Sequence, residues 1–142
     1  MGKPDTPKRT SSGKRAKGPL VLLVEDAVDV RALFTEILMA DGFRVIDAHH
    51  GHAAVVKALA YLPDVIVMDI SLPLMDGARA ARVLRSNDRS RPIPIVAFTA
   101  RTLDPRDRRE FDAVLHKPCA PEALIRTVRL LLAERQRGSR GS

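Results

Sequence analysis

Three carboxylates stand directly behind two hydrophobic segments of the chain. Leu20–Val24 is an apolar run followed by Glu25 and Asp26, and Val65–Met68 is another, followed by Asp69. Short apolar runs rich in valine, isoleucine and leucine predict strands buried on both faces of a parallel sheet. The carboxylates must then lie where the strands emerge, and like charges that close raise one another's pKa unless a cation lies between them. The pattern predicts a divalent metal site beside a carboxylate with a chemical role of its own.

Two more polar groups follow predicted strands. Thr99 comes directly after Ile93–Phe98, and Lys117 comes directly after Val114–His116. Ligand sites of open α/β sheets lie at the carboxyl ends of the strands, so both groups are expected at the same edge as the carboxylates. Carboxylate oxygens suit Mg2+, and a carboxylate whose charge is shielded can attack a phosphoryl group. Thr99 can then donate a hydrogen bond to one phosphoryl oxygen, while Lys117 neutralises another.

Strand and helix patterns alternate along the chain and position these groups. A further strand is predicted at Phe43–Ile46, and apolar residues recur at helical spacing from Val30 to Leu38. Later helices are predicted at Ala53–Leu62, Ala78–Arg85 and Pro121–Glu134. Five strands interleaved with helices predict an α/β domain, with a doubly wound five-stranded parallel sheet and helices on both faces.

The net charge of +7 is concentrated at the two ends of the 142-residue chain. Residues 1–19 hold six basic residues against one acid, and residues 134–142 hold three against one. We therefore expect disordered basic tails at residues 1–19 and 135–142 around a domain at residues 20–134. A contact of the tails with nucleic acid or an acidic surface is the less favoured alternative to solvated ends, because no aromatic residues are interleaved there for base stacking.

Composition also bears on where the protein acts. The sequence has no run of 18 or more apolar residues, so we expect no membrane insertion. A single cysteine, Cys119, rules out an internal disulfide and suits a reducing, cytoplasmic location.

The motifs around the polar groups resemble the receiver domain of two-component response regulators, the chemotaxis-type phosphoacceptor fold. The resemblance covers about residues 20 to 134 and implies a flavodoxin-like strand order of 2-1-3-4-5. Since no residues remain for an output domain, it implies a stand-alone receiver. The motifs are Val24-Glu25-Asp26, the segment from Val67 to Gly77, Phe98-Thr99-Ala100 and His116-Lys117-Pro118.

The resemblance also implies a role for each residue and a set of partners. Phosphate would come from a phosphohistidine on a sensor histidine kinase or a histidine phosphotransfer protein, and the signal would pass to an unknown downstream protein. The domain would catalyse only its own phosphorylation and dephosphorylation. By position, Asp69 matches the phosphoacceptor, Asp26 a direct ligand of Mg2+ (or Mn2+), Glu25 an acid acting through water, the Ser71 backbone carbonyl a further ligand, Thr99 the switch hydroxyl, Lys117 the phosphate-binding lysine, and Lys117-Pro118 a cis peptide bond. Ser71 and Arg101 are expected to tune the lifetime of the phosphate.

One stretch departs from the family pattern. Thr99 and Lys117 lie 18 positions apart, about one helical turn less than is usual in the family, which predicts a short and highly charged fourth helix. Val114 stands where the family places the aromatic residue that rotates on phosphorylation. These departures leave open a phosphorylation-independent adaptor. A second alternative is a Mg2+-dependent aspartyl phosphohydrolase, although such enzymes usually carry Asp-x-Asp where this chain has Glu25-Asp26-Ala27.

Simpler interpretations exist for several polar residues. Glu25 and Asp26 could merely cap the first helix. Three histidines, His49, His50 and His52, could bind a transition metal, although a polar loop is favoured. The arginines of the third helix, Arg79, Arg82 and Arg85, are predicted to form a solvated stripe.

Overall fold

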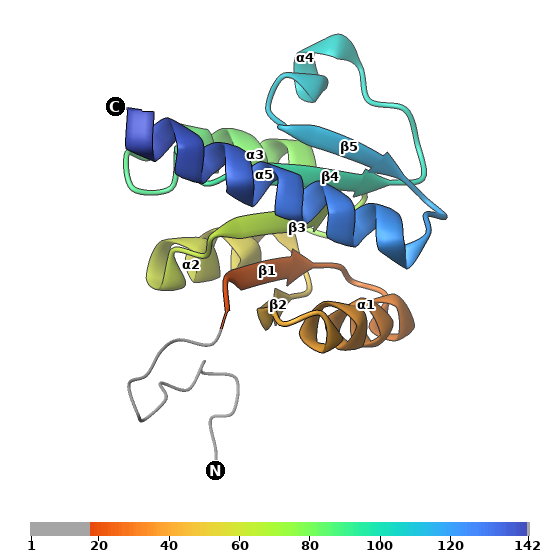
Figure 1. Ribbon diagram of the computed structural model, residues 1–142. Helices are drawn as coiled ribbons and strands as arrows, with labels where there is room; N and C mark the ends of the chain where they lie inside the picture. Colours follow the sequence, from red (N-terminus) through yellow and green to blue (C-terminus); the bar gives the residue numbers. More distant parts are fainter. Residues whose placement is uncertain (1–17, 142) are drawn as a thin grey trace.

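Five parallel strands form the centre of the fold. The structure is a computed structural model and describes residues 18–141. The strands lie in the order β2-β1-β3-β4-β5, so the predicted order is confirmed (Figure 1). Chain order alternates strand and helix throughout. The strands are β1 (Leu20–Val24), β2 (Arg44–Ala48), β3 (Val65–Asp69), β4 (Ile95–Thr99) and β5 (Ala113–His116).

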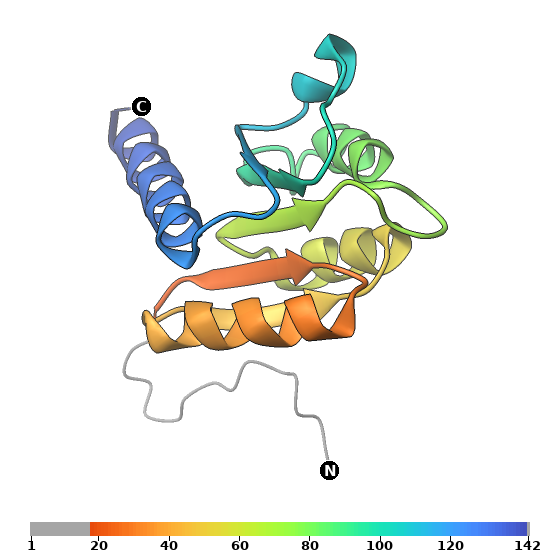
Figure 2. The same ribbon diagram turned by 90° about the vertical axis from the view of Figure 1, so that its right-hand side faces the viewer.

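Five helices connect and cover these strands. They are α1 (Val28–Ala40), α2 (Gly51–Tyr61), α3 (Gly77–Arg85), α4 (Pro105–Arg108) and α5 (Pro121–Gly141). Helices α2 and α3 lie on one side of the sheet, and α1 and α5 lie on the other (Figure 2). Within residues 18–141, no helix combines the length and the apolar character needed to cross a membrane.

The sheet separates two apolar cores, because side chains alternate between its faces along each strand. Leu22 and Ile66 belong to the core beneath α2 and α3, whereas Leu23 and Val67 belong to the core beneath α1 and α5. β1, β3 and β4 are buried along their whole length. The ends of these strands therefore hold the residues that follow them in fixed positions.

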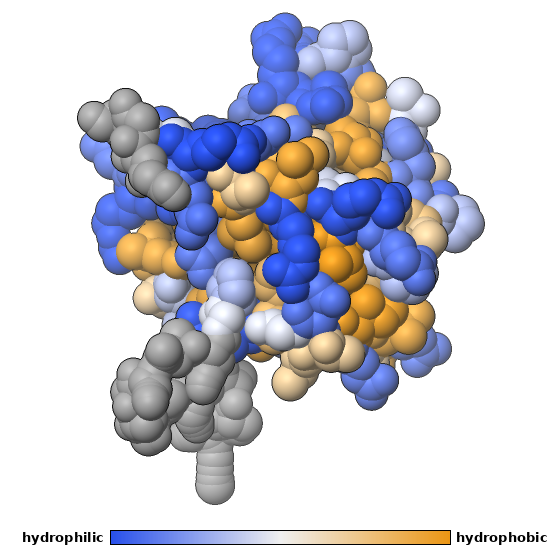
Figure 3. Space-filling model, viewed as in Figure 1, coloured by the Kyte–Doolittle hydropathy of each residue, from blue (hydrophilic) through white to orange (hydrophobic). Residues whose placement is uncertain are grey.

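Helix α4 is short, as the sequence predicts, and contains four residues. Asp104 caps its start by accepting a hydrogen bond from the Asp107 amide at 2.8 Å, and Pro105 occupies the first turn. None of its residues is buried. Its position beyond β5 coincides with a hydrophilic part of the surface (Figures 1 and 3). Polar contacts, and not burial, must hold α4 in place.

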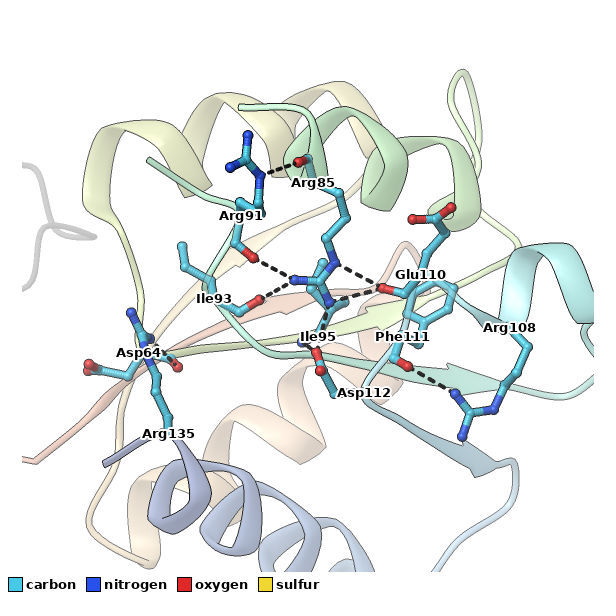
Figure 4. Close-up of polar contacts among 10 residues, drawn as sticks. All are labelled: Asp64, Arg85, Arg91, Ile93, Ile95, Arg108, Glu110, Phe111, Asp112 and Arg135. Carbon is cyan, nitrogen blue, oxygen red and sulfur yellow. Dashed lines mark hydrogen bonds and ion pairs between the residues drawn. The ribbon is translucent and has the colours of Figure 1, made fainter. Parts of the chain in front are cut away.

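Arg85 corrects the prediction of a solvated arginine stripe. Its side chain is only 24% exposed and makes five hydrogen bonds (Figure 4). Two go to the Glu110 carbonyl, at 3.2 and 3.0 Å, and one goes to the Asp112 carboxylate at 2.8 Å. The other two reach the Arg91 and Ile93 carbonyls at 2.8 and 2.9 Å. The guanidinium thus joins the end of α3 to the segments that enter β4 and β5.

Substitution Arg85→Met should destabilise the whole domain. The apolar side chain fills much of the space but leaves three carbonyls and a carboxylate without their donor, a loss of about 2–3 kcal/mol. We expect the melting temperature to fall by roughly 8–12 °C. Arg79→Met on the same helix is the control, because its exposed side chain has no hydrogen-bond or ion-pair partner among the described residues. Equal melting temperatures for the two variants would contradict the role assigned to Arg85.

The C-terminal helix continues past its predicted end at Glu134. α5 reaches Gly141, so it includes most of the segment expected to be a disordered tail from residue 135. Arg135 anchors the extension by donating to the Asp64 carbonyl at 3.0 Å, and the Asp64 carboxylate accepts from the Leu20 amide at 2.8 Å. The predicted N-terminal tail, residues 1–19, lies outside the described residues except for Gly18 and Pro19.

Candidate functional site

Parallel register brings the polar residues together at the carboxyl edge of the sheet. Val24 pairs with Met68, so the residues that follow, Glu25 and Asp69, are neighbours. Thr99 pairs with His116, which places Lys117 just beyond Thr99. The pairing of Asp69 with Phe98 joins the two halves of the site. The sheet order alone therefore explains why residues far apart in sequence converge.

The three carboxylates form one cluster. Oxygen atoms of Glu25, Asp26 and Asp69 all lie within 4.8 Å of one another, and no other group of three or more acidic, histidine or cysteine side chains within residues 18–141 has such spacing. Glu25 and Asp69 are 1% and 5% exposed, whereas Asp26 is open to solvent. Burial, and to a lesser degree the charge of Asp69, raises the pKa of Glu25. Hard oxygen donors at one partly open point fit a divalent cation such as Mg2+.

Lys117 bridges the two buried acids. Its Nζ lies 2.9 Å from Glu25 Oε1 and 3.2 Å from Asp69 Oδ2, and 5.0 Å from the centre of the Phe98 ring. Burial lowers the pKa of Lys117, but the hydrogen bond to Glu25 and the charges of both acids outweigh burial, so the net pKa is raised. One ammonium against three carboxylates leaves an excess of negative charge, which a cation at the same point would balance.

Thr99 is fully buried, and its hydroxyl is engaged with the backbone that follows it. Thr99 Oγ1 accepts from the Arg101 amide at 3.0 Å and donates to the Arg101 carbonyl at 3.2 Å. The Thr99 carbonyl accepts from the Lys117 amide at 2.8 Å, which ties β4 to the residue after β5. For Thr99 to donate to a group on Asp69, its bond to the Arg101 carbonyl must break.

The loop after β3 holds the Asp69 carboxylate from the other side. Asp69 Oδ1 accepts from the Ser71 amide at 3.1 Å. Helix α3 begins against this residue, because a Cβ on Gly77 would lie only 2.4 Å from the Asp69 carbonyl oxygen. Asp76 caps the helix by accepting from the Arg79 amide at 2.9 Å. Asp69 is therefore fixed on both oxygens and on its backbone.

Comparison with known proteins identifies the family. Residues 21–129 match the family model described as the response regulator receiver domain, which is more than half of the chain. The chain belongs to the response regulator receiver domain family. A phosphoacceptor role in two-component signalling is consistent with that membership.

Relatives and solved structures of receiver domains agree with the fold. The polar-differentiation response regulator DivK of Brucella anthropi is 30% identical over 118 residues, which is 80% of this chain and 96% of DivK. A protein-glutamate methylesterase/protein-glutamine glutaminase of Vibrio cholerae is 42% identical over 86 residues, but these are only 22% of that protein. The receiver domain of the sensor histidine kinase PA1611 of Pseudomonas aeruginosa has a TM-score of 0.75 and 32% identity, over 82% of this chain and 98% of that one. That structure has a magnesium ion coordinated in its active site cleft.

The structure also shows the positions of four other residues considered in the sequence analysis: Pro118, Val114, Asp26 and His50. The Lys117-Pro118 peptide bond is cis, as predicted. Val114 is half-buried and packs against the core beneath α2 and α3. Ala27, and not Asp26, occupies the N-cap position of α1, and no side chain caps this helix. The alternative role of Asp26 as a helix cap is therefore wrong. His50 caps α2, with Nδ1 accepting from the Ala53 amide at 3.2 Å.

Two neighbours of the site were given no role by the sequence analysis. Arg31, from α1, donates to the Glu25 carbonyl at 2.7 Å and lies 3.5 Å from the Asp47 carboxylate. Phe98 lies beneath the Lys117 ammonium and packs edge-on against Phe34, with 5.2 Å between ring centres. Phe98 directly precedes Thr99 in the sequence, which is the one clue to its place.

An apolar groove also borders the site. A cavity of about 470 Å³ lies between α1 and the end of β5, lined by Val30, Leu33, Phe34, Phe98, Ala100, Lys117, Pro118 and Cys119. Figure 3 shows apolar surface where α1 and α5 lie next to each other. Burial raises the pKa of the Cys119 thiol, which suits a packing role.

Proposed function

We propose that this receiver domain accepts a phosphoryl group on Asp69. The observation that carries the proposal is the geometry of that carboxylate: it is nearly buried, held by the Ser71 amide and the Lys117 ammonium, and grouped with Glu25 and Asp26 within 4.8 Å. The Ser71 amide and the Lys117 ammonium compensate negative charge at Asp69, and the two neighbouring acids could hold a cation that would compensate more, so this carboxylate is suited to carry the added charge of a phosphoryl group.

The reaction joins one Asp69 oxygen to phosphorus. The phosphorus–nitrogen bond of a phosphohistidine donor breaks, its electron pair stays on the imidazole nitrogen, and that nitrogen takes a proton from solvent. Lys117 neutralises one phosphoryl oxygen, and Thr99 donates to another after its hydroxyl leaves the Arg101 carbonyl. The product is an acyl phosphate on Asp69.

A divalent cation fits the same site. We propose that Asp26 and Asp69 hold Mg2+ (or Mn2+) directly, with the Ser71 backbone carbonyl, and that Glu25 acts through water. A bound cation supplies positive charge beside the phosphoryl oxygens. The excess of negative charge over the single Lys117 ammonium supports this assignment.

The partners and the fate of the phosphate follow from the same proposal. The donor is a sensor histidine kinase or a histidine phosphotransfer protein in the cytoplasm, and the receiver passes its signal to a downstream protein. The domain acts on its own Asp69 and does not turn over a separate substrate. Ser71 lies two residues after Asp69, and Arg101 lies two residues after Thr99. From these positions the two side chains set the rate at which water removes the phosphate.

A phosphorylation-independent adaptor is the second candidate. Val114 and the four-residue α4 favour it, because Val114 has no aromatic ring that could rotate and α4 is only about one turn long. This candidate keeps the fold and the acidic cluster but predicts no covalent change.

Acetyl phosphate with Mg2+ tests the proposal without a cognate kinase. We expect the intact mass of the protein to rise by about 80 Da, the mass of one phosphoryl group. Chelation of the metal with EDTA before the donor is added should suppress the gain, because Asp26 and Asp69 then lose the cation that shields them. Absence of any gain, with metal present and with a histidine phosphotransfer donor, would leave the adaptor as the function.

A further inference from the structure

The turn between β1 and α1 presents Asp26 without holding its side chain. The Asp26 carboxylate is open to solvent, and within residues 18–141 it has no hydrogen-bond or ion-pair partner of its own. One of its oxygen atoms nevertheless lies within 4.8 Å of oxygen atoms of Glu25 and Asp69. The position of this carboxylate must therefore be set by the backbone on either side of it.

Arg31, on α1, holds the backbone on both sides of Asp26. Its guanidinium donates to the Glu25 carbonyl at 2.7 Å, and its main-chain amide donates to the Ala27 carbonyl at 2.9 Å. The Glu25 side chain closes the same turn, because its Oε2 accepts from the Ala27 amide at 3.0 Å. Any residue at this position of α1 could supply the main-chain bond, whereas the bond to the Glu25 carbonyl needs a long side chain that ends in a donor.

The guanidinium of Arg31 is itself held in place from the second strand. Its Nε lies 3.5 Å from the Asp47 carboxylate, in β2, and the Arg31 side chain is only 13% exposed. Asp47 is anchored in turn, because its carbonyl accepts from Lys57 Nζ, on α2, at 2.6 Å. The turn that carries Asp26 is thus tied through Arg31 to β2.

We propose that Arg31 is a positioning residue for the metal ligand Asp26. The guanidinium fixes the Glu25 carbonyl, so that the next residue along the chain directs its carboxylate toward Asp69. This inference rests on the metal assignment in the proposed function. It adds that the Mg2+ affinity of the site depends on a side chain from α1 that is not itself a ligand, because a guanidinium has only donors.

The charge and the position of Arg31 act in opposite directions on Mg2+ binding. A positive charge beside the carboxylate cluster repels a cation, so removal of the charge by itself tightens Mg2+ binding. Loss of the bond to the Glu25 carbonyl frees the turn, so Asp26 loses its orientation and Mg2+ binding weakens. Loss of a contact that orients a metal ligand typically lowers metal affinity by roughly 10- to 100-fold. The sign of the change therefore separates a positioning role from a simple effect of charge.

Isothermal titration calorimetry of the full chain with MgCl2 tests the proposal without any phosphoryl donor. We expect Arg31→Met, which keeps much of the buried volume, to raise the Mg2+ dissociation constant about tenfold. Arg31→Lys keeps the charge and a donor but lacks the fork that reaches both the Glu25 carbonyl and the Asp47 carboxylate, so its affinity should lie between those of Arg31→Met and the wild type. Unchanged or tighter Mg2+ binding in Arg31→Met would overturn the positioning role.

Arg129→Met is the matched control for stability. Arg129, on α5, also bonds a carboxylate and a carbonyl, both of Asp41, at 2.7 and 2.6 Å, and Asp41 lies at the opposite end of α1 from Asp26. Both variants should lower the melting temperature, but only Arg31→Met should weaken Mg2+ binding. Equal losses of Mg2+ affinity would mean that Arg31 acts only through the stability of the domain, which would overturn the proposal. Should Arg31→Met fail to fold, Arg31→Lys and Arg129→Lys make the same comparison.

Acetyl phosphate with Mg2+ separates this inference from the proposed function. We expect Arg31→Met to need about tenfold more Mg2+ for its half-maximal rate of mass gain and to approach the wild-type rate when Mg2+ saturates. A gain of about 80 Da with the same Mg2+ requirement in both proteins would refute the positioning role alone. Absence of the gain in the wild type would refute the proposed function, while the calorimetry still decides the role of Arg31. A wild type that binds no Mg2+ would refute the metal assignment and the positioning role together.

Discussion

Asp69→Asn is expected to gain no mass when it is incubated with acetyl phosphate and Mg2+. The carboxamide has nearly the shape of the carboxylate and keeps an oxygen that can accept from the Ser71 amide, which lies 3.1 Å from Asp69 Oδ1. It lacks the charged oxygen that attacks phosphorus, so the acyl phosphate cannot form. Intact-mass measurement should show the gain of about 80 Da in the wild type only.

The fold of this variant should be intact, which separates lost chemistry from lost structure. Asp69 contributes one of three clustered negative charges, so its removal relieves repulsion on Glu25 while Lys117 keeps its bond to Glu25. We expect the melting temperature of Asp69→Asn to equal or exceed that of the wild type. A mass gain that persists in a folded Asp69→Asn would place the acceptor elsewhere. Repeated turnover of a phosphate ester by the wild type, lost in the variant, would favour the phosphohydrolase.

The sheet edge was predictable from sequence because each polar group directly follows an apolar strand. A buried parallel strand has a strong signature, and its end must lie at the carboxyl edge, so the sequence alone places Glu25, Asp69 and Thr99 there. The same reasoning predicted the short α4, because the distance along the chain from Thr99 to Lys117 leaves little room for a helix.

Side-chain partners far apart in sequence could not be predicted in this way. Arg79, Arg82 and Arg85 look alike as a charged stripe, yet Arg85 is drawn into a ring of carbonyls that only the folded chain assembles. The sequence pattern also predicts the end of α5 too early, at Glu134, for a related reason. Glu134, Arg135 and Gln136 are good helix formers, and the anchor that decides their state is the Asp64 carbonyl on another loop.

Lys117→Met is expected to slow phosphorylation by acetyl phosphate on the order of 100-fold or more, as for the loss of one preorganised charged donor. Methionine keeps the bulk of the side chain over the Phe98 ring but removes the ammonium that lies 3.2 Å from Asp69 Oδ2. The added negative charge of the phosphoryl group then has one compensating group fewer. The initial rate of mass gain at fixed donor and Mg2+ measures the effect.

The same variant tests the balance of charge in the cluster. Without Lys117, Glu25 remains 1% exposed with its charge no longer paired, so the variant should be less stable than the wild type in the absence of metal. If Mg2+ binds the folded state as proposed, it offsets the same charges and should raise the melting temperature more in Lys117→Met than in the wild type. Lys57→Met is the matched control, since within residues 18–141 Lys57 Nζ donates only to the Asp47 carbonyl. Phosphorylation of Lys117→Met within threefold of that control would mean that Lys117 holds the resting site together without contributing to the transfer.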